Sequence, residues 1–264
     1  MLVSDEKANN YLKNIIKVLK PYENQLDSII LFGSHARGEP GPFSDVDLLI
    51  VFKKRDKEIF KKIISRIRFL ELKFGYTKKS ANIIELCLAY LNVATGMFRS
   101  WFLCSSDDLK NMNFSKITSI NTLISKILAP SSLVLDNILR DGKVIVGNKE
   151  LLHEIPHEKK STIQPFRSIL MNSLLSIGAL IISPFTKTSQ YYSLEAIKWS
   201  LFVLNEINIK SSLLPIGLKN HLRIYYNVKK TGSFNPYLPM KAPIIIYRIH
   251  RHIFHELKKI KMTN

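Results

Sequence analysis

The sequence LFGSHARGEPGPFSDVDLLIVF, residues 31–52, contains the features that decide the fold. Two apolar runs of strand length enclose a Gly33-Ser34 pair, a loop rich in glycine and proline, and the acidic residues Asp45 and Asp47. Side chains alternate between the two faces of a strand, so both aspartates project to one side while the residue between them projects to the other. The pattern therefore predicts two strands, with two carboxylates converging at the start of the second.

Two adjacent carboxylates indicate a site for a cation and a phosphate. Like charges repel, and the pairing is tolerable when a cation lies between them, as in the paired magnesium ions of phosphoryl-transfer sites. Gly33 permits close approach of the backbone, and the N–H groups after Ser34 can cradle the β and γ phosphates of a triphosphate. Arg37 adds positive charge one turn further on. We expect this segment to bind a nucleoside triphosphate together with two Mg²⁺ ions.

The segment resembles the DNA polymerase β-like nucleotidyltransferase superfamily. The signature of that superfamily is a Gly-Ser pair, a spacer and an acid-apolar-acid strand, here with ten residues between Ser34 and Asp45. The resemblance covers residues 26–90 and is nearest to the minimal nucleotidyltransferases and the aminoglycoside nucleotidyltransferases. It implies that Asp45 and Asp47 bind the metal ions and that the Gly33 turn binds phosphate.

The superfamily also places a third carboxylate on a neighbouring strand. Glu85 is the only acid in the apolar run ANIIELCLAY, residues 81–90, so the resemblance implies that it completes the metal site and helps to activate the attacking hydroxyl. The residues alone leave a second interpretation open, in which Glu85 is a surface residue of an edge strand. Asp107 and Asp108 are further candidates for a general base, although SSDDLK is equally typical of a capped helix start.

Hydrophobic periodicity divides the chain into two parts. Strand-length apolar runs alternate with amphipathic runs such as residues 56–74, which predicts an α/β (α+β) unit. The family resemblance implies that residues 1–150 form a nucleotidyltransferase domain with a mixed sheet. A helix ending at Asp141-Gly142 and a short strand are expected near its end. Residues 151–264 show helical periodicity without strand patterns, so we expect an all-helical second domain. Its expected helices cover residues 163–182, 191–207, 214–228 and 243–260.

Net charge restricts the partners. The 264 residues include 39 basic and 21 acidic ones, and the formal net charge of +18 attracts nucleotides, nucleic acids or acidic lipid surfaces. The segment from Lys219 to Lys261 contains ten basic residues and one acid, interleaved with aromatic residues suited to phosphate contacts and base stacking. A solvated helix face with core aromatics explains the same composition, as does a genome biased toward lysine codons.

Composition also excludes several classes of protein. Hydrophobic residues make up 46% and charged residues 23%, which is ordinary for a globular chain and excludes a disordered or fibrous one. Cys87 and Cys104 are too few for a disulfide framework, and the first residues lack the apolar region of a signal peptide, so we expect a cytoplasmic protein. Residues 169–183 are shorter than the roughly 20 apolar residues that a bilayer requires. We expect them to form a buried helix, and we expect no membrane partner.

These features predict a transferase that moves a nucleoside monophosphate, with ATP as the expected donor of AMP, to an acceptor hydroxyl by a two-metal mechanism. RNA or a protein is the favoured acceptor. An aminoglycoside antibiotic is an alternative, but such a polycation would approach the basic chain against its field unless an acidic pocket existed, and the helical half has few acids. A non-catalytic, antitoxin-like regulatory module that binds the nucleotide is the alternative from another class. The base preference and the oligomeric state stay open.

Overall fold

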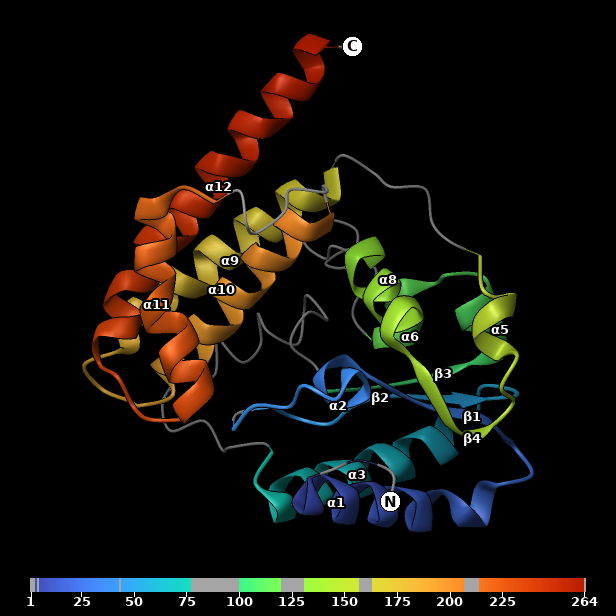
Figure 1. Ribbon diagram of the computed structural model, residues 1–264. Coiled ribbons are helices and arrows are strands. Elements are labelled where there is room, and N and C mark those ends of the chain that lie inside the picture. Colours follow the sequence, from blue (N-terminus) through green and yellow to red (C-terminus); the bar gives the residue numbers. More distant parts are fainter. Residues whose placement is uncertain are drawn as a thin grey trace.

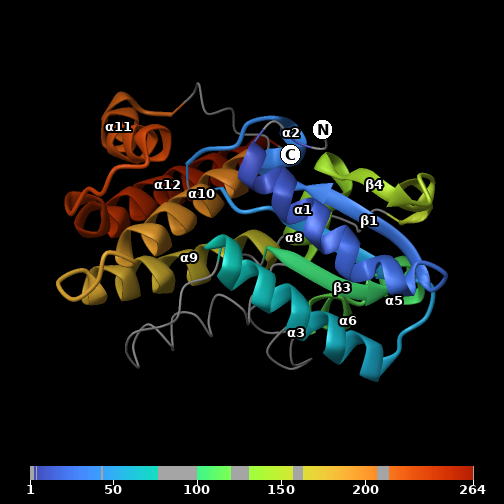
Figure 2. The same ribbon diagram turned by 90° about the horizontal axis from the view of Figure 1, so that it is seen from below.

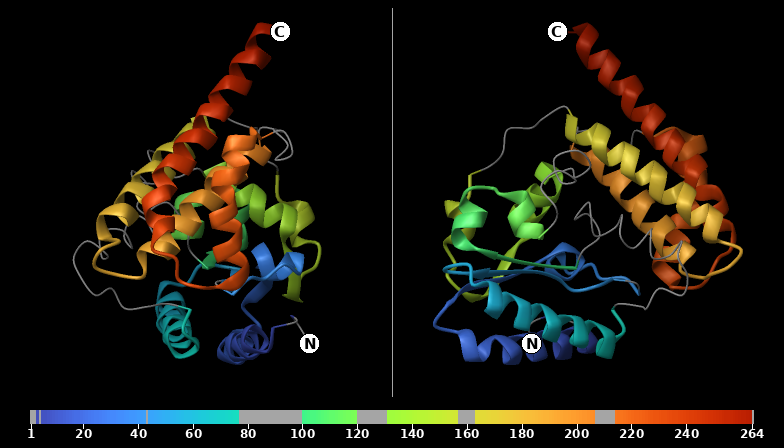
Figure 3. Two further views of the ribbon diagram at one scale, coloured as in Figure 1. Left: turned by 60° about the vertical axis from the view of Figure 1, so that its left-hand side comes forward. Right: turned by 180° about the vertical axis from the view of Figure 1, so that it is seen from behind.

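The computed structural model places a four-stranded sheet and its covering helices beside a bundle of long helices (Figure 1). The structure describes residues 3, 5–42, 44–76, 100–119, 131–156, 163–206 and 214–263. The view from behind in Figure 3 shows the same two halves, with the sheet and its helices on one side and the bundle on the other.

The sheet is mixed, as the sequence predicts. Its strands are β1 (Leu26–Phe32), β2 (Asp47–Phe52), β3 (Trp101–Ser105) and β4 (Lys143–Gly147), in the spatial order β3-β2-β1-β4. β1 pairs antiparallel with β2 and β4, whereas β2 and β3 run parallel. The register of the first pair sets Phe32 opposite Asp47. The residues that follow β1 therefore meet the first residue of β2 at one end of the sheet.

Two long helices, α1 (Glu6–Leu19) and α3 (Lys57–Phe74), cover one face of the sheet (Figure 2). Each begins after an aspartate whose side chain accepts backbone N–H bonds, a cap worth about 1 kcal/mol. Leu48 and Ile50 of β2 belong to the core on this face. α3 supplies the crossover that a parallel pair such as β2 and β3 requires. A short 3-10 helix, η1 (Lys20–Tyr22), follows α1.

Shorter helices and part of the bundle cover the opposite face. The helices are α2 (Gly33–Arg37), α5 (Ser106–Lys110), α6 (Phe114–Thr118), α8 (Ser131–Asp141) and the 3-10 helix η2 (Leu151–Glu154). Leu49 and Val51 of β2 belong to the core on this face, and that core also contains Met171 and Trp199 from the bundle. The α/β half and the bundle therefore share apolar packing, and the domain boundary at residue 150 stays a prediction.

The bundle consists of four described helices. They are α9 (Ile163–Ile182), α10 (Ser189–Glu206), α11 (Ile216–Thr231) and α12 (Tyr237–Thr263). A separate core of buried residues holds them together, from Leu175 on α9 to Ile253 on α12. The end of α12 projects away from the body of the molecule (Figure 1). The predicted all-helical character of this half is confirmed.

α12 begins six residues before the predicted start at Pro243. A proline inside a helix removes one backbone hydrogen bond and costs about 3 kcal/mol, which is why the sequence favours a helix that starts there. Leu238 and Ala242 are fully buried in the bundle core, and their burial offsets that cost. Tertiary packing, which the local pattern does not contain, therefore sets the start of α12.

α9 differs from the fully buried helix that its composition predicts. Its inner side, including Leu175 and Ala179, is buried, whereas Leu170 is 53% exposed and Ile181 is 55% exposed. Residues Pro165–Ile182 are long and apolar enough to cross a membrane by length and composition, and 39% of that window is buried inside the protein. The prediction of a buried helix therefore holds for one side of α9 only.

Of the other helices and strands, some confirm a prediction and two were not predicted, and one predicted strand is untested. The helix ending at Gly75 and the helix and strand over residues 131–147 are confirmed. α1 and β3 were not predicted from the sequence. The predicted strand over residues 81–90 lies outside the described residues, so it stays a prediction.

Candidate active site

The site begins where β1 ends. Gly33 has a φ of 70°, in the left-handed region that favours glycine, and it opens the short helix α2. A Cβ atom added to Gly33 would lie 2.0 Å from Oδ2 of Asp47, closer than any two such atoms approach. Only glycine therefore lets the turn and the carboxylate lie against each other, which gives a physical reason for the Gly-Ser pair in the sequence.

The two aspartates point to the same side of the sheet, as strand alternation predicts. Val46 between them is buried in the core beneath α1 and α3, while Asp45 and Asp47 are half-buried on the other face. Burial raises the pKa of Asp45, and burial together with the neighbouring Asp45 charge raises the pKa of Asp47 well above its ordinary value. The pair is therefore under electrostatic strain that a bound cation would relieve.

A buried glutamate from α3 also acts on this pair. Glu71 is 7% exposed, and its Oε1 accepts a hydrogen bond of 2.7 Å from the hydroxyl of Ser100. Its charge contributes to the raised pKa of Asp45. The sequence offered no signal for this proximity, because Glu71 follows the helical pattern of α3 without interruption.

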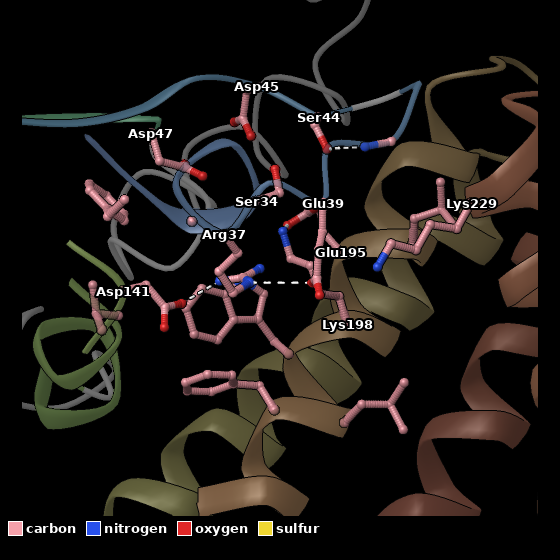
Figure 4. Close-up of a pocket in the computed structure, with 18 of the residues that line it drawn as sticks. Ser34, Arg37, Glu39, Ser44, Asp45, Asp47, Asp141, Glu195, Lys198 and Lys229 are labelled. Carbon is pink, nitrogen blue, oxygen red and sulfur yellow. Dashed lines mark hydrogen bonds and ion pairs between the residues drawn. The ribbon is translucent and has the colours of Figure 1, made fainter. Parts of the chain in front are cut away.

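Arg37 at the end of α2 joins the turn to α8. Its Nη1 donates to Asp141 Oδ2, and its Nε lies 3.7 Å from Glu39 Oε2. The side chain of Asp141 is only 8% exposed and also accepts a bond of 3.0 Å from Arg140. Arg37 is thus held by carboxylates at the rim of the cavity shown in Figure 4.

The bundle contributes an ion pair on α10. Lys198 Nζ lies 2.5 Å from Glu195 Oε2, three residues earlier on the same helix. Burial lowers the pKa of Lys198, but Glu195 and Asp45 raise it by more, so the net pKa is raised. Burial raises the pKa of Glu195, and the charge of Asp45 adds to that rise. Figure 4 shows both side chains on the bundle side of the cavity that the aspartates line.

The cavity between the two halves has a volume of about 490 Å³. Lys229 and Tyr226 reach it from α11, and Trp199 and Phe202 form part of its apolar lining. Its charged lining residues are Arg37, Glu39, Asp45, Asp47, Arg140, Asp141, Glu195, Lys198 and Lys229. Five of these residues are acids and four are bases, and the bundle supplies one of the acids, Glu195, together with Lys198 and Lys229.

The structure places the predicted site residues unequally. Gly33, Ser34, Arg37, Asp45 and Asp47 all line this cavity. Glu85 lies outside the described residues, so its role as third ligand stays a prediction. Within the part of the chain that the structure describes, no group of three His, Cys, Asp or Glu side chains is placed to hold a metal ion.

Asp107 and Asp108 lie away from the cavity. Both belong to α5, which follows the end of β3, and Ser105 there pairs with Phe52 at the far end of β2. That end is about 17 Å from Asp47 at the strand rise of 3.3 Å per residue. Asp108 forms a capping box with Ser105 and bonds to Arg55 Nε at 3.2 Å. The capped helix start, which the sequence allowed, is the observed role.

Comparison with known proteins identifies the family. Residues 12–90 match the family model described as "Nucleotidyltransferase domain". A provisionally named protein adenylyltransferase of Methanocaldococcus jannaschii is 38% identical over 69 residues, which are 24% of this chain and 68% of that protein. The chain belongs to the DNA polymerase β-like nucleotidyltransferase superfamily. The predicted superfamily is confirmed, and with it the class of transferase domain.

Other relatives of this nucleotidyltransferase match over shorter shares of their length. Two further proteins of the same archaeon, also provisionally named protein adenylyltransferases, are 47% identical over 55 residues and 42% identical over 65. These matches cover 20% and 23% of this chain, which spans 37% and 63% of the two relatives. The chain thus spans less than two thirds of either.

A solved structure extends the likeness in fold to both halves of the nucleotidyltransferase. It is the spectinomycin adenyltransferase from Enterococcus faecialis, determined with ATP and spectinomycin. The match has a TM-score of 0.54 and covers 92% of this chain and 99% of that one. The identity is 13%, so the match establishes the fold alone: an α/β sheet domain followed by helices.

Proposed function

We propose that this nucleotidyltransferase transfers AMP from ATP to an acceptor hydroxyl. The supporting observation is that one cavity brings the carboxylates of Asp45 and Asp47 together with the ammonium groups of Lys198 and Lys229. Carboxylates bind hard cations and ammonium groups bind phosphate oxygens, the two requirements of metal-dependent phosphoryl transfer. ATP is the proposed donor because the curated relatives are named adenylyltransferases.

The aspartate pair fits two Mg²⁺ ions. Its raised pKa values reflect two adjacent, half-buried carboxylates without enough compensating charge, and carboxylate oxygens are the ligands that Mg²⁺ prefers. Bound there, the ions would neutralise charge on the phosphates. Asp45 and Asp47 would hold them, and Glu85 is the third ligand that we propose from the family resemblance.

In the proposed transfer, the acceptor oxygen bonds to the α-phosphorus while the bond from that phosphorus to the β-phosphate oxygen breaks. Pyrophosphate leaves, and the hydroxyl proton passes to a carboxylate, for which Glu85 is our candidate. The Gly33-Ser34 turn and Lys198 hold the departing negative charge. Positioning and charge neutralisation supply most of the rate enhancement in such reactions.

RNA or a protein remains the acceptor that we favour. The net charge of +18 supports a polyanionic acceptor, since the field of the whole chain attracts it. The names of the curated relatives support a protein acceptor. An acceptor of either kind would enter from the open side of the cavity.

An amine-bearing antibiotic is a second candidate acceptor. Glu195 and Glu39 give the cavity carboxylates beyond the aspartate pair, and such groups bind ammonium groups. The solved structure of similar fold was determined with spectinomycin as well as ATP. Four basic residues also line the cavity and oppose a cationic acceptor, so this candidate stays second to RNA or a protein.

Labelled-triphosphate transfer tests the proposal. The protein is incubated with each α-³²P triphosphate, Mg²⁺ and, separately, RNA, lysate protein or spectinomycin, and label on each acceptor is counted. Asp45→Asn and Asp47→Asn are expected to lower transfer at least about 100-fold, because each removes one of the carboxylates that hold the ions. Near-normal transfer by either variant overturns the catalytic assignment. ATP binding by the wild-type protein without transfer to any acceptor supports the regulatory, antitoxin-like alternative instead.

A further inference from the structure

The outer sides of α11 and α12 form a basic and aromatic surface beside the cavity. We call it the α11–α12 face and define it by Arg223, Lys230, Tyr237, Lys241, Tyr247 and Arg251, all of which are exposed. The two helices are successive and lie side by side in the bundle (Figure 1, Figure 3). Arg248 Nη1 of α12 lies 3.2 Å from His221 Nδ1 of α11, at the seam between the two helices.

Helical spacing places these residues on one side of each helix. On α12, Tyr237, Lys241, Arg248 and Arg251 follow one another at intervals of four, seven and three residues, so they line one stripe along about 20 Å of helix. The opposite side of α12, including Ile249, is buried in the bundle core. The stripe is therefore a surface left over after α12 has buried its apolar side.

The charge of this face fits a polyanion. Residues 216–263 contain ten lysines and arginines and one acid, Glu256, which lies 3.2 Å from His255. Surface cations are normally interspersed with acids, and a surface with so few attracts phosphates along its whole length. A chain of phosphates releases counterions from such a surface, which strengthens binding at low salt.

The aromatic residues of the face favour a nucleic acid with accessible bases. Tyr237 is 61% exposed and Tyr247 is 64% exposed, whereas Tyr225 on the inner side of α11 is 3% exposed. Exposed rings between cations are the elements of single-strand binding, in which bases stack on aromatic faces and phosphates bind the cations. α12 also exposes Met240 (56%) and Ile244 (49%) beside these rings, so an anionic membrane is the alternative that the experiment must separate from RNA.

We propose that the α11–α12 face binds single-stranded RNA. The face adjoins the cavity, because Tyr226 and Lys229 of the same helix α11 line it. A strand bound across α11 would therefore lie beside residues that line the cavity. The inference does not rest on the proposed adenylyl transfer, since binding to this face needs neither the aspartates nor a triphosphate.

Fluorescence anisotropy with a labelled unstructured oligoribonucleotide tests the proposal. The variant Arg223→Glu/Lys230→Glu/Arg251→Glu is expected to bind at least about tenfold more weakly at low salt. Its plot of log affinity against log salt should be shallower by about 2, because each lost phosphate contact removes roughly 0.7 from the slope for a single strand. Tyr237→Ala/Tyr247→Ala should weaken binding while leaving that slope unchanged, since stacking releases no counterions.

The matched control is Lys13→Glu/Lys17→Glu/Lys62→Glu, which makes the same change in net charge on exposed residues of α1 and α3, on the far face of the sheet. It should bind RNA within about twofold of the wild-type protein. Equal loss in both triple variants overturns the proposal, because net charge alone would then explain binding. The absence of RNA binding at low salt also overturns it. So does a result in which the wild-type protein binds anionic phospholipid vesicles and the first triple variant loses that binding while its RNA binding is unchanged. Asp45→Asn should bind RNA normally, which separates failure of this proposal from failure of the proposed transfer.

Discussion

At the scale of single residues, the contact between Gly33 and Asp47 requires glycine at position 33 for two reasons. The backbone φ of 70° is disfavoured for other residues, and the Asp47 side chain leaves no room for a Cβ atom. Gly38, at the other end of α2, shares the first reason with a φ of 79° but has no atom within 4 Å of the added Cβ. A comparison of the two glycines therefore separates the effect of backbone strain from that of collision with the Asp47 carboxylate.

We expect Gly33→Ala to abolish nucleotide transfer and Gly38→Ala to retain most of it. Both variants should lose about 1 to 2 kcal/mol of stability from the left-handed backbone, because a Cβ atom is disfavoured there. Only Gly33→Ala must displace Asp47 to fit. Transfer assays and urea unfolding of both variants check this, and similar activity in the two would contradict the proposed role of the turn.

Lys198 is the other residue whose role depends on its exact neighbours. Its ammonium group lies between Glu195 on its own helix and the electrostatic field of the aspartates. We expect Lys198→Met to lower kcat/KM for ATP about 100-fold, as removal of one preorganised donor to a reacting phosphate does. Steady-state kinetics check this, with Lys17→Met on exposed α1 as the control. Unchanged kinetics in Lys198→Met would place the triphosphate elsewhere in the cavity.

At the scale of elements, the packing of α12 against α10 buries a histidine. His250 is 5% exposed, its Nε2 lies 3.2 Å from the hydroxyl of Ser200, and burial lowers its pKa to about 4. The unfolded chain binds a proton at the ordinary pKa of 6.5, so it holds more protons than the folded protein between pH 6.5 and about 4. The contribution of neutral His250 to the free energy of unfolding is therefore fully present above pH 6.5 and is lost as the pH falls from 6.5 to about 4.

We expect the free energy of unfolding to fall by as much as about 3 kcal/mol between pH 7 and pH 4 from this residue alone. His250→Gln keeps a polar group near Ser200 and removes the titration, so its stability should change less over the same range. Urea unfolding at several pH values measures both proteins. Parallel pH profiles would show that His250 is not the group responsible.

At the scale of the whole molecule, the two halves are joined by the cavity and by a shared core. Trp199 from the bundle packs in the same core as β2, and Trp101 lies in β3 on the sheet. The chain contains only these two tryptophans, one in each half. Trp101 therefore reports on the sheet, and Trp199 reports on the core that the bundle shares with the sheet.

We expect the remaining tryptophan of Trp101→Phe, and likewise that of Trp199→Phe, to report a fluorescence midpoint equal to the circular dichroism midpoint of the same variant. The reason is that removing the bundle would open the sheet core around Met171 and Trp199. Fluorescence in urea, compared with circular dichroism on the same samples, checks this. Two separate midpoints would contradict it and would favour two domains that unfold independently near the predicted boundary at residue 150.

Local patterns in the sequence were enough for several parts of this protein. Strand alternation put Asp45 and Asp47 on one side, and helical periodicity gave the ranges of α3 and α9 closely. These features depend on residues within a few positions of each other, and the geometry of a strand or helix repeats over that distance. The family resemblance rested on the same short segment.

Only the tertiary structure decided what faces the aspartates. No local period relates Glu195 or Lys198 to Asp45, about 150 residues earlier, and the position of α10 depends on how apolar side chains such as Trp199 pack against the sheet. The register of β1 and β2 decided the position of the phosphate-binding turn that we propose, because the pairing of Phe32 with Asp47 brings Gly33 against a carboxylate. The sequence by itself determined which groups could bind metal and phosphate. Long-range packing determined that two lysines and one glutamate from the bundle share their cavity, because burial of apolar surface fixes helix positions without regard to distance along the chain.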